Sequence, residues 1–443
     1  MQNQGIRDAR SLGAPKLLVL GLQHMFAMFG ATVLVPALTG LSVSATLLFA
    51  GLGTLFFHFL TKGKVPAFLG SSFAYLAGYA AIAPNGEAAL LPYACVGVAA
   101  SGLLYLILAA LVRGFGANRV MRFFPPVVTG PIIICIGMTL ANSAINNCTG
   151  SWDIALVAIL TVVIFNIWGK GMLRIIPILL GVLVSYVYAA VTGRVDFSGV
   201  ASAAWIGLPV KMENTVFSLI GNCDANLLVT AIIAIMPIAF ATMIEHIGDI
   251  CAISSTVGAN FIADPGLHRT LLGDGLATSI ASLFGAPANT TYGENTGVLA
   301  LTRVYDPLVI RLAAVYAIIA SFCPKFAALV SAMPTGTIGG VSLILYGMIS
   351  AIGVRNLVEN RVDLAKSRNV IVVSLIISLA LGITFSTAGA ITFHVGEFTL
   401  NFSGLAVAAI VGIVVNAILP GKDYTFQNDY EYGKTTEDHG QML

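Results

Sequence analysis

Two glutamates lie in stretches so apolar that lipid or packed helices must surround them. Glu245 interrupts the apolar run of residues 227–254, and Glu294 lies within NTTYGENTGVLAL (289–301). A charge at membrane depth costs about 2.5–3.5 kcal/mol on insertion scales, so such residues usually face a cavity and act on an ion, a proton or a substrate. The alternative is a neutral carboxylic acid that hydrogen-bonds between helices.

A third acid lies close to the first. Glu245 and Asp249 are four residues apart, so they share one face of a helix about one turn apart. Together with Glu294 they cannot all ionise in a pocket of low dielectric constant. A carboxyl group that gains or loses a proton as the pocket opens to each side would couple transport to protons. A sodium site built from carbonyls of a broken helix is the alternative.

Two histidines and one aspartate give weaker signals. His24 and His246 lie in apolar segments and are interpreted either as polar packing residues or as proton relays, and His24 is kept among the proton-coupling candidates. Asp274 lies near the end of an apolar segment and is interpreted as structural. No metal site or cofactor is expected, apart from the proton as coupling ion.

The composition requires a membrane for these residues. The chain has 443 residues, of which 57% are hydrophobic and 9% charged, whereas about 25% are charged in an ordinary soluble domain. Its mean hydropathy is +0.91. The chain is therefore predicted to be an all-α polytopic membrane protein.

Fourteen segments are apolar and long enough to cross, given that a span needs about 20 residues and fewer if it is broken. They cover residues 17–38, 41–60, 66–83, 89–112, 124–145, 152–168, 174–192, 227–254, 270–285, 289–303, 307–330, 335–353, 369–391 and 403–420.

Loop charge predicts the orientation of these segments. If both termini lie on one side, all but three of the 22 basic residues fall in loops on that side, and the exceptions are Arg194, Lys211 and Lys325. The positive-inside rule then makes both termini cytoplasmic. No targeting segment is visible, which favours a bacterial plasma (inner) membrane.

A faint internal repeat divides the chain into two halves of seven segments. Gln23-His24 precedes Ser72 by the same 49 residues that separate Glu245 from Glu294. Because seven is odd, the second half must enter the membrane in the opposite sense, as in alternating-access transporters. The predicted organisation is a cytoplasmic N-terminus, two repeats and a cytoplasmic tail, at residues 1–16, 17–220, 221–421 and 422–443.

The third and tenth segments hold corresponding places and are both interrupted. PAFLGSSFAYLAG (66–78) is short and rich in hydroxyl groups, and GAPANTTYGENTGV (285–298) carries Gly and Pro among polar residues. Both favour extended backbone followed by a half-helix that starts at mid-depth, which is the best sequence indication of a transporter site. Backbone N–H donors there, with carboxylate acceptors, suit a flat heterocycle, and Phe73, Tyr75 and Tyr292 could form its walls.

Several motifs together resemble those of bacterial uracil:proton symporters in the nucleobase–ascorbate transporter family. They are QHMFAMFGATVLVP, GKVPAFLGSSFAY, FPPVVTGPIII, PGLHRTLLGDGLAT, NTTYGENTGVLALTRVY and GGVSLILYG. The resemblance covers nearly the whole chain. It implies a core domain of segments 1–4 and 8–11 and a gate domain of segments 5–7 and 12–14. It also implies short strands in segments 3 and 10 and a possible homodimer.

The same resemblance implies roles for individual residues. Glu245 and Glu294 would accept the N–H groups of the base, and Phe73 and Gly293 would donate backbone N–H groups to its carbonyls. Tyr346 and His24 match positions that the family places near the site.

One motif departs from the uracil members. At position 249 the uracil members have His, whereas this chain has Asp, the residue that purine-transporting relatives carry. At position 294 those purine-transporting relatives have Gln, whereas this chain has Glu. The function expected is import of uracil with a proton, with xanthine or another purine as the alternative and an ion channel as a remote one. An intramembrane enzyme is not expected, because no HExxH or GxSxG motif occurs. The partners expected are the base and lipid, not nucleic acid.

Overall fold

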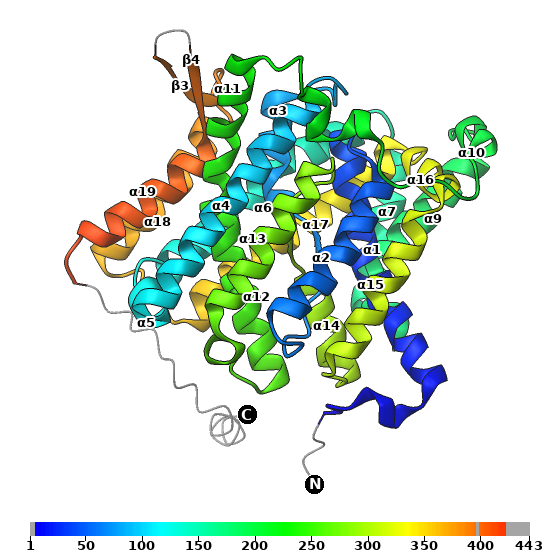
Figure 1. Ribbon diagram of the computed structural model, residues 1–443, viewed down its shortest axis with the longest axis horizontal. Coiled ribbons are helices and arrows are strands. Elements are labelled where there is room, and N and C mark those ends of the chain that lie inside the picture. The colour runs from blue at the N-terminus through cyan, green and yellow to red at the C-terminus, as the bar shows by residue number, and fades with distance from the viewer. Residues whose placement is uncertain (1–4, 396–397, 422–443) are drawn as a thin grey trace.

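Helices dominate the computed structural model, which describes residues 5–395 and 398–421 (Figure 1). Within those residues seven helices are long and apolar enough to cross a membrane, or eight if one bent pair is a single span. Shorter apolar helices accompany them. The chain is thus a mostly helical, multi-pass membrane protein, as its composition predicts. The tail predicted at residues 422–443 lies outside the described residues.

The first half of the chain contains twelve labelled elements among its described residues, besides η1 (Ala9–Leu12). They are α1 (Ala14–Thr39), α2 (Val43–Leu60), β1 (Leu69–Ser71), η2 (Phe73–Tyr75), α3 (Leu76–Ile82), α4 (Leu91–Phe115), α5 (Ala117–Met121), α6 (Pro126–Cys148), α7 (Trp152–Trp168), α8 (Met172–Ile175), α9 (Pro177–Val191) and α10 (Ser198–Ser202).

The second half contains sixteen labelled elements among its described residues. Its elements are η3 (Met212–Asn214), η4 (Val216–Leu219), α11 (Ala225–Ile235), η5 (Met236–Ile238), α12 (Ala239–Val257), η6 (Ile262–Gly266), α13 (Leu267–Leu283), β2 (Asn289–Thr291), α14 (Gly293–Thr302), α15 (Pro307–Ser321), α16 (Pro324–Ser331), α17 (Thr335–Glu359), α18 (Ser367–Thr384), β3 (Ala390–Val395), β4 (Phe398–Ser403) and α19 (Gly404–Ile418).

Three predicted segments differ from the structure. The segment predicted at 307–330 is bent by 88° between α15 and α16, because Pro324 starts a new helix and cannot continue the old one. The segment predicted at 227–254 contains the 3-10 turn η5 around Pro237. The segment predicted at 369–391 ends at Thr384, and a β3–β4 hairpin follows.

The β3–β4 hairpin corrects the expectation that strands occur only in segments 3 and 10. Its first strand reads AITFHV, in which apolar and polar residues alternate. That period of two is typical of a strand and not of a spanning helix. In Figure 1 the hairpin lies at the upper left of the view, beside the upper end of α11, and β4 packs against that helix.

Helix packing recurs between the two halves. α2 packs against α15 while α4 packs against α13, and α7 packs against α9 while α18 packs against α19. α6 and α17 pack against each other, and a Cβ at Gly137 of α6 would lie only 2.2 Å from the Tyr346 carbonyl oxygen. Small residues allow such close approach of helices within a bilayer.

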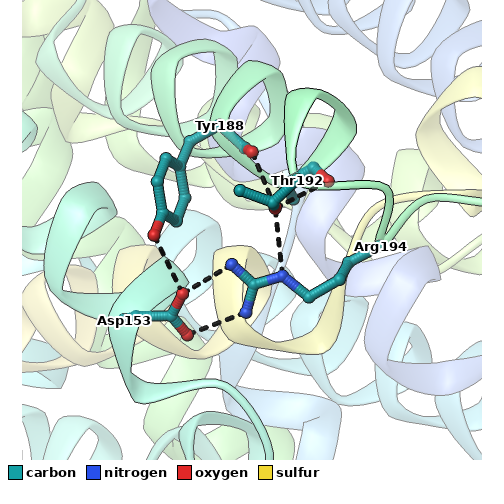
Figure 2. Close-up of polar contacts among 5 residues, drawn as sticks. Asp153, Tyr188, Thr192 and Arg194 are labelled. Carbon is teal, nitrogen blue, oxygen red and sulfur yellow. Dashed lines mark hydrogen bonds and ion pairs between the residues drawn. The ribbon is translucent and has the colours of Figure 1, made fainter.

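A polar cluster at the end of α9 joins that helix to the start of α7 (Figure 2). The Arg194 guanidinium donates to both carboxylate oxygens of Asp153, at 2.9 and 2.5 Å. Tyr188 Oη donates to the same carboxylate at 3.1 Å, and Arg194 Nε donates to Thr192 Oγ1 at 3.0 Å. Both charged side chains remain partly exposed, at 37% for Arg194 and 47% for Asp153.

Candidate functional site

The two interrupted segments meet where β1 and β2 pair antiparallel, with Gly70 opposite Thr290 at the centre. The short strands predicted in segments 3 and 10 are therefore confirmed. Phe73 opens η2 after β1, and Gly293 opens α14 after β2. N–H groups in a first turn have no acceptor within their own helix. Figure 1 places α3 near the top and α14 near the bottom, so the half-helices leave the crossing toward opposite faces.

Close packing of Tyr292 on β1 fixes this crossing. A Cβ at Gly70 would lie 2.5 Å from the Tyr292 ring, so only glycine fits there. The Tyr292 hydroxyl donates to the Ser71 carbonyl oxygen at 2.9 Å and accepts from Thr32 Oγ1 at 3.3 Å. Tyr292 is buried and bonded between α1 and β1. Its predicted contact with a substrate stays a prediction.

The acids of α12 lie beside the start of α14. Thr291 Oγ1 donates to Asp249 Oδ2 at 2.8 Å, and a Cβ at Gly293 would lie 3.9 Å from Asp249 Oδ1. Glu245 lies one turn earlier on the same helix, and both acids are partly buried. The structure thus brings Asp249 and Gly293 together, with Glu245 on the adjoining turn.

A fully buried contact between a histidine and an aspartate lies next to these acids. His246 Nδ1 is 3.3 Å from Asp274 Oδ2, and neither side chain is exposed. Thr291 Oγ1 lies 3.5 Å from the same histidine nitrogen. The rings of Phe57 and Tyr105 surround the imidazole, with centroids 6.3 and 6.4 Å away. Asp274, interpreted above as structural, therefore joins α13 to the polar residues of α12 and β2.

His24 of α1 contacts α14 through Asn295. The Asn295 amide donates to His24 Nδ1 and to the His24 carbonyl oxygen, both at 3.2 Å. Among the described residues no hydrogen-bond partner faces Nε2 of the same ring, which is buried. The proton-coupling candidate is therefore directly bonded to α14.

An aromatic pair adjoins the first interrupted segment. The rings of Phe73 and Tyr346 meet edge to face, with centroids 5.8 Å apart. Tyr346 is 1% exposed. Its hydroxyl lies near Ser342, one turn earlier on α17, and neither hydroxyl has a hydrogen-bond partner among the residues that the structure describes. The structure therefore places two predicted substrate residues, from segments 3 and 12, in contact.

Glu294 is the second residue of α14, directly before Asn295. The prediction for its side chain lies outside what the structure describes.

The sequence profile of the permease family matches residues 15–389. The chain belongs to that family. The resemblance inferred from the motifs is confirmed at the level of the family, as is the expectation of a permease instead of an enzyme.

Two relatives of this permease are similar over nearly their whole length. The uracil permease of Bacillus caldolyticus is 42% identical over 437 residues, which cover 96% of each chain. The uracil permease of Bacillus subtilis (strain 168) is 39% identical over 452 residues, which cover 99% of this chain and 98% of the relative.

The fold of the permease is also found in a solved structure. The transmembrane domain of a cyanobacterium bicarbonate transporter, BicA, matches with a TM-score of 0.62, covering 94% of this chain and all of that one. The identity is only 13%, so the likeness shows the fold alone.

Two polar residues beside the crossing were missed by sequence reasoning. Thr291 and Asn295 flank the motif residues Tyr292 and Glu294, and their side chains bond to α12 and α1. Asp274 was interpreted as structural, and its buried contact with His246 agrees with that interpretation.

Proposed function

We propose that this permease imports uracil together with a proton. The observation that carries the proposal is the position of Asp249, within hydrogen-bond reach of Thr291 and beside Gly293 at the start of α14. An acid and a helix N-terminus at one crossing supply both acceptors and donors for a small heterocycle. The names of the two Bacillus relatives support uracil as that heterocycle.

The base is recognised through its alternating N–H and carbonyl groups. Glu245 and Glu294 accept from the ring N–H groups, and the backbone N–H groups of Phe73 and Gly293 donate to its carbonyls. The edge-to-face pair of Phe73 and Tyr346 supports this arrangement by providing an apolar wall next to one donor.

Proton coupling uses the acids of α12. Asp249 and Glu245 share a helix face and are partly exposed, so a proton can reach them from an open pocket. His24 is hydrogen-bonded through Nδ1 to Asn295, a residue of the half-helix α14. Protonation of one acid would remove a charge from the crossing before it moves through the low-dielectric interior.

Transport proceeds by alternating access between two inverted repeats of seven segments each. In this organisation α2 corresponds to α13, α4 to α15, α7 to α18 and α9 to α19. The α2–α15 contact then matches the α13–α4 contact, and the α7–α9 contact matches the α18–α19 contact, which supports the proposed repeat. In the proposed arrangement the core domain, segments 1–4 and 8–11, moves against the gate domain, segments 5–7 and 12–14. The protein functions in a bacterial inner membrane with both termini cytoplasmic, where it can form a homodimer.

Xanthine or another purine is the second candidate substrate. Asp249 stands where the uracil members of the family have His. It contacts Thr291 at the crossing and could change the shape of the pocket. Competition of labelled uracil uptake by unlabelled uracil, thymine, xanthine and hypoxanthine decides between them.

The proposed coupling is tested in lipid vesicles into whose membrane the purified protein is reconstituted. Labelled uracil should accumulate when the exterior is acidic, and a protonophore should abolish the accumulation. Glu245→Gln should retain some binding but lose accumulation, and Glu294→Gln should weaken uracil binding while admitting purines. Glu359→Gln, at an exposed position far along α17, is the matched control and should behave as the parent. Uptake that ignores the protonophore would remove the proton from the mechanism.

A further inference from the structure

An apolar groove of about 510 Å³ lies outside the transport site. Its walls come from α4, α5, the residues directly after α5, α12 and α19, and they include Ile107, Leu111, Phe123, Met243 and Ile413. The volume lies within the range of about 300–1,000 Å³ found for small-molecule sites. The groove is therefore large enough for a flexible hydrocarbon chain.

The side chains around the groove face hydrocarbon and not water. Ile107 is 55% exposed, Phe115 60% and Phe123 47%. An apolar patch of this kind is unfavourable in water but normal on the lipid-facing surface of a multi-pass protein. A depression in such a surface is filled by the lipid that surrounds it.

One charged residue, Arg119, borders the groove. Arg119 is exposed and forms no ion pair with any residue from 5 to 395 or 398 to 421. Arg113 and Arg122 flank it along the chain and are exposed as well. This end of α4 lies on the side where most basic loop residues gather, which the positive-inside rule makes cytoplasmic. Basic residues at that surface attract anionic lipid.

We propose that the groove is a binding site for one anionic phospholipid of the cytoplasmic leaflet. One acyl chain fills the groove between α4, α12 and α19, and the phosphate lies against the Arg119 guanidinium. The apolar walls determine that the occupant is a lipid chain, and the arginine at the edge, which pairs with no acid in the described part of the chain, selects an anionic headgroup.

The position of the groove gives the lipid a place in the transport cycle. α4 and α12 belong to the proposed core domain, whereas α19 belongs to the proposed gate domain. An acyl chain between them lies at the boundary where the two domains slide. This consequence rests on the proposed function, but lipid binding itself does not, and binding can be measured on protein that transports nothing.

Native mass spectrometry of the purified full-length protein tests the site. The protein is mixed in mild detergent with equal amounts of phosphatidylglycerol and phosphatidylcholine. The parent should retain phosphatidylglycerol preferentially. Arg119→Gln should lower that retention about fivefold, the loss expected from one basic residue at an anionic surface. Ile107→Trp, which fills the groove from an exposed position, should lower the retention of either lipid at least as much.

Matched controls separate the groove from the rest of the surface. Arg174→Gln removes an exposed arginine from the loop region before α9, and Leu160→Trp enlarges a lipid-facing residue of α7 that is 57% exposed. Both should retain phosphatidylglycerol as the parent does. Equal retention of the two lipids by the parent, or equal losses in test and control variants, would overturn the proposal. Thermal melting with and without phosphatidylglycerol checks that each variant is folded.

Discussion

The two interrupted segments share a backbone plan but differ in the chemistry of their partners. Each has a three-residue strand followed by a short helix, and the strands pair with each other. In the first segment the Tyr75 hydroxyl bonds to Ser101 at 2.7 Å and to Thr242 at 3.3 Å, both neutral groups. In the second segment Thr291 bonds to Asp249 and Asn295 bonds to His24, both titratable groups.

This difference indicates that two similar local folds can have different roles at one crossing. The first segment is held by hydroxyl groups whose bonds do not change with pH near neutrality. The second is held by groups whose hydrogen-bonding changes when a proton binds. We therefore expect the second segment to respond to protons and the first to supply a fixed surface.

The largest effect is expected where both segments depend on one contact. Gly70→Ala would place a Cβ 2.5 Å from the Tyr292 ring and separate β1 from β2. Overpacking of this kind costs about 1–3 kcal/mol, and uptake should be lost because the crossing itself is displaced. Gly297→Ala on α14 is the control, since a Cβ there meets no atom within 4 Å. Uptake and melting temperature are measured for both, and a Gly70→Ala protein that transports normally would contradict the fixed crossing.

The next effect should be confined to the second segment. Thr291→Val keeps the shape of the side chain but removes the donor to Asp249. A hydrogen bond to a charged group contributes about 1.5–3 kcal/mol, so uptake should fall about tenfold or more, with a shifted pH profile.

Thr290→Val is its matched control, because the neighbouring Thr290 hydroxyl is buried and has no hydrogen-bond partner among the described residues. Initial uptake rates from pH 5 to 8 compare the two variants. Equal losses would mean that the strand, and not the contact with Asp249, determines the rate.

A smaller effect is expected from the equivalent test in the first segment. Tyr75→Phe removes the hydroxyl that bonds to Ser101 and Thr242. It should lower the free energy of unfolding by about 1 kcal/mol and leave the pH profile of uptake unchanged. Thermal melting and uptake are measured together. A pH profile shifted as far as that of Thr291→Val would remove the proposed division between the segments.

The smallest effect is expected away from both segments. Asp153→Asn breaks the partly exposed pair with Arg194 shown in Figure 2. Exposed ion pairs contribute little because water and salt screen them. Melting temperature and uptake should both match the parent within error. A marked loss of uptake would show that the contact between α7 and α9 also controls transport.

Much of the fold could be predicted because its signals are local. Apolar runs predict spanning helices wherever they occur, and Gly and Pro predict interruption near residues 66–78 and 285–298. The 88° bend between α15 and α16 was missed although Pro324 marks it. The β3–β4 hairpin was missed because nearly all of it lies between the segments predicted at 369–391 and 403–420, where only a loop was expected.

The sequence by itself determined that the chain crosses a membrane, that it carries acids at depth and that two segments are broken. The first two follow from the solvation of the residues concerned, and the third follows from the backbone preferences of Gly and Pro. Only the tertiary structure decided that Thr291 meets Asp249, that His246 pairs with Asp274 and that Asn295 holds His24. Thr291 lies in β2 and Asn295 follows it, and β2 pairs with β1, a strand some 220 residues away in the chain. No local pattern encodes such a register, because it is set by how the surrounding helices pack.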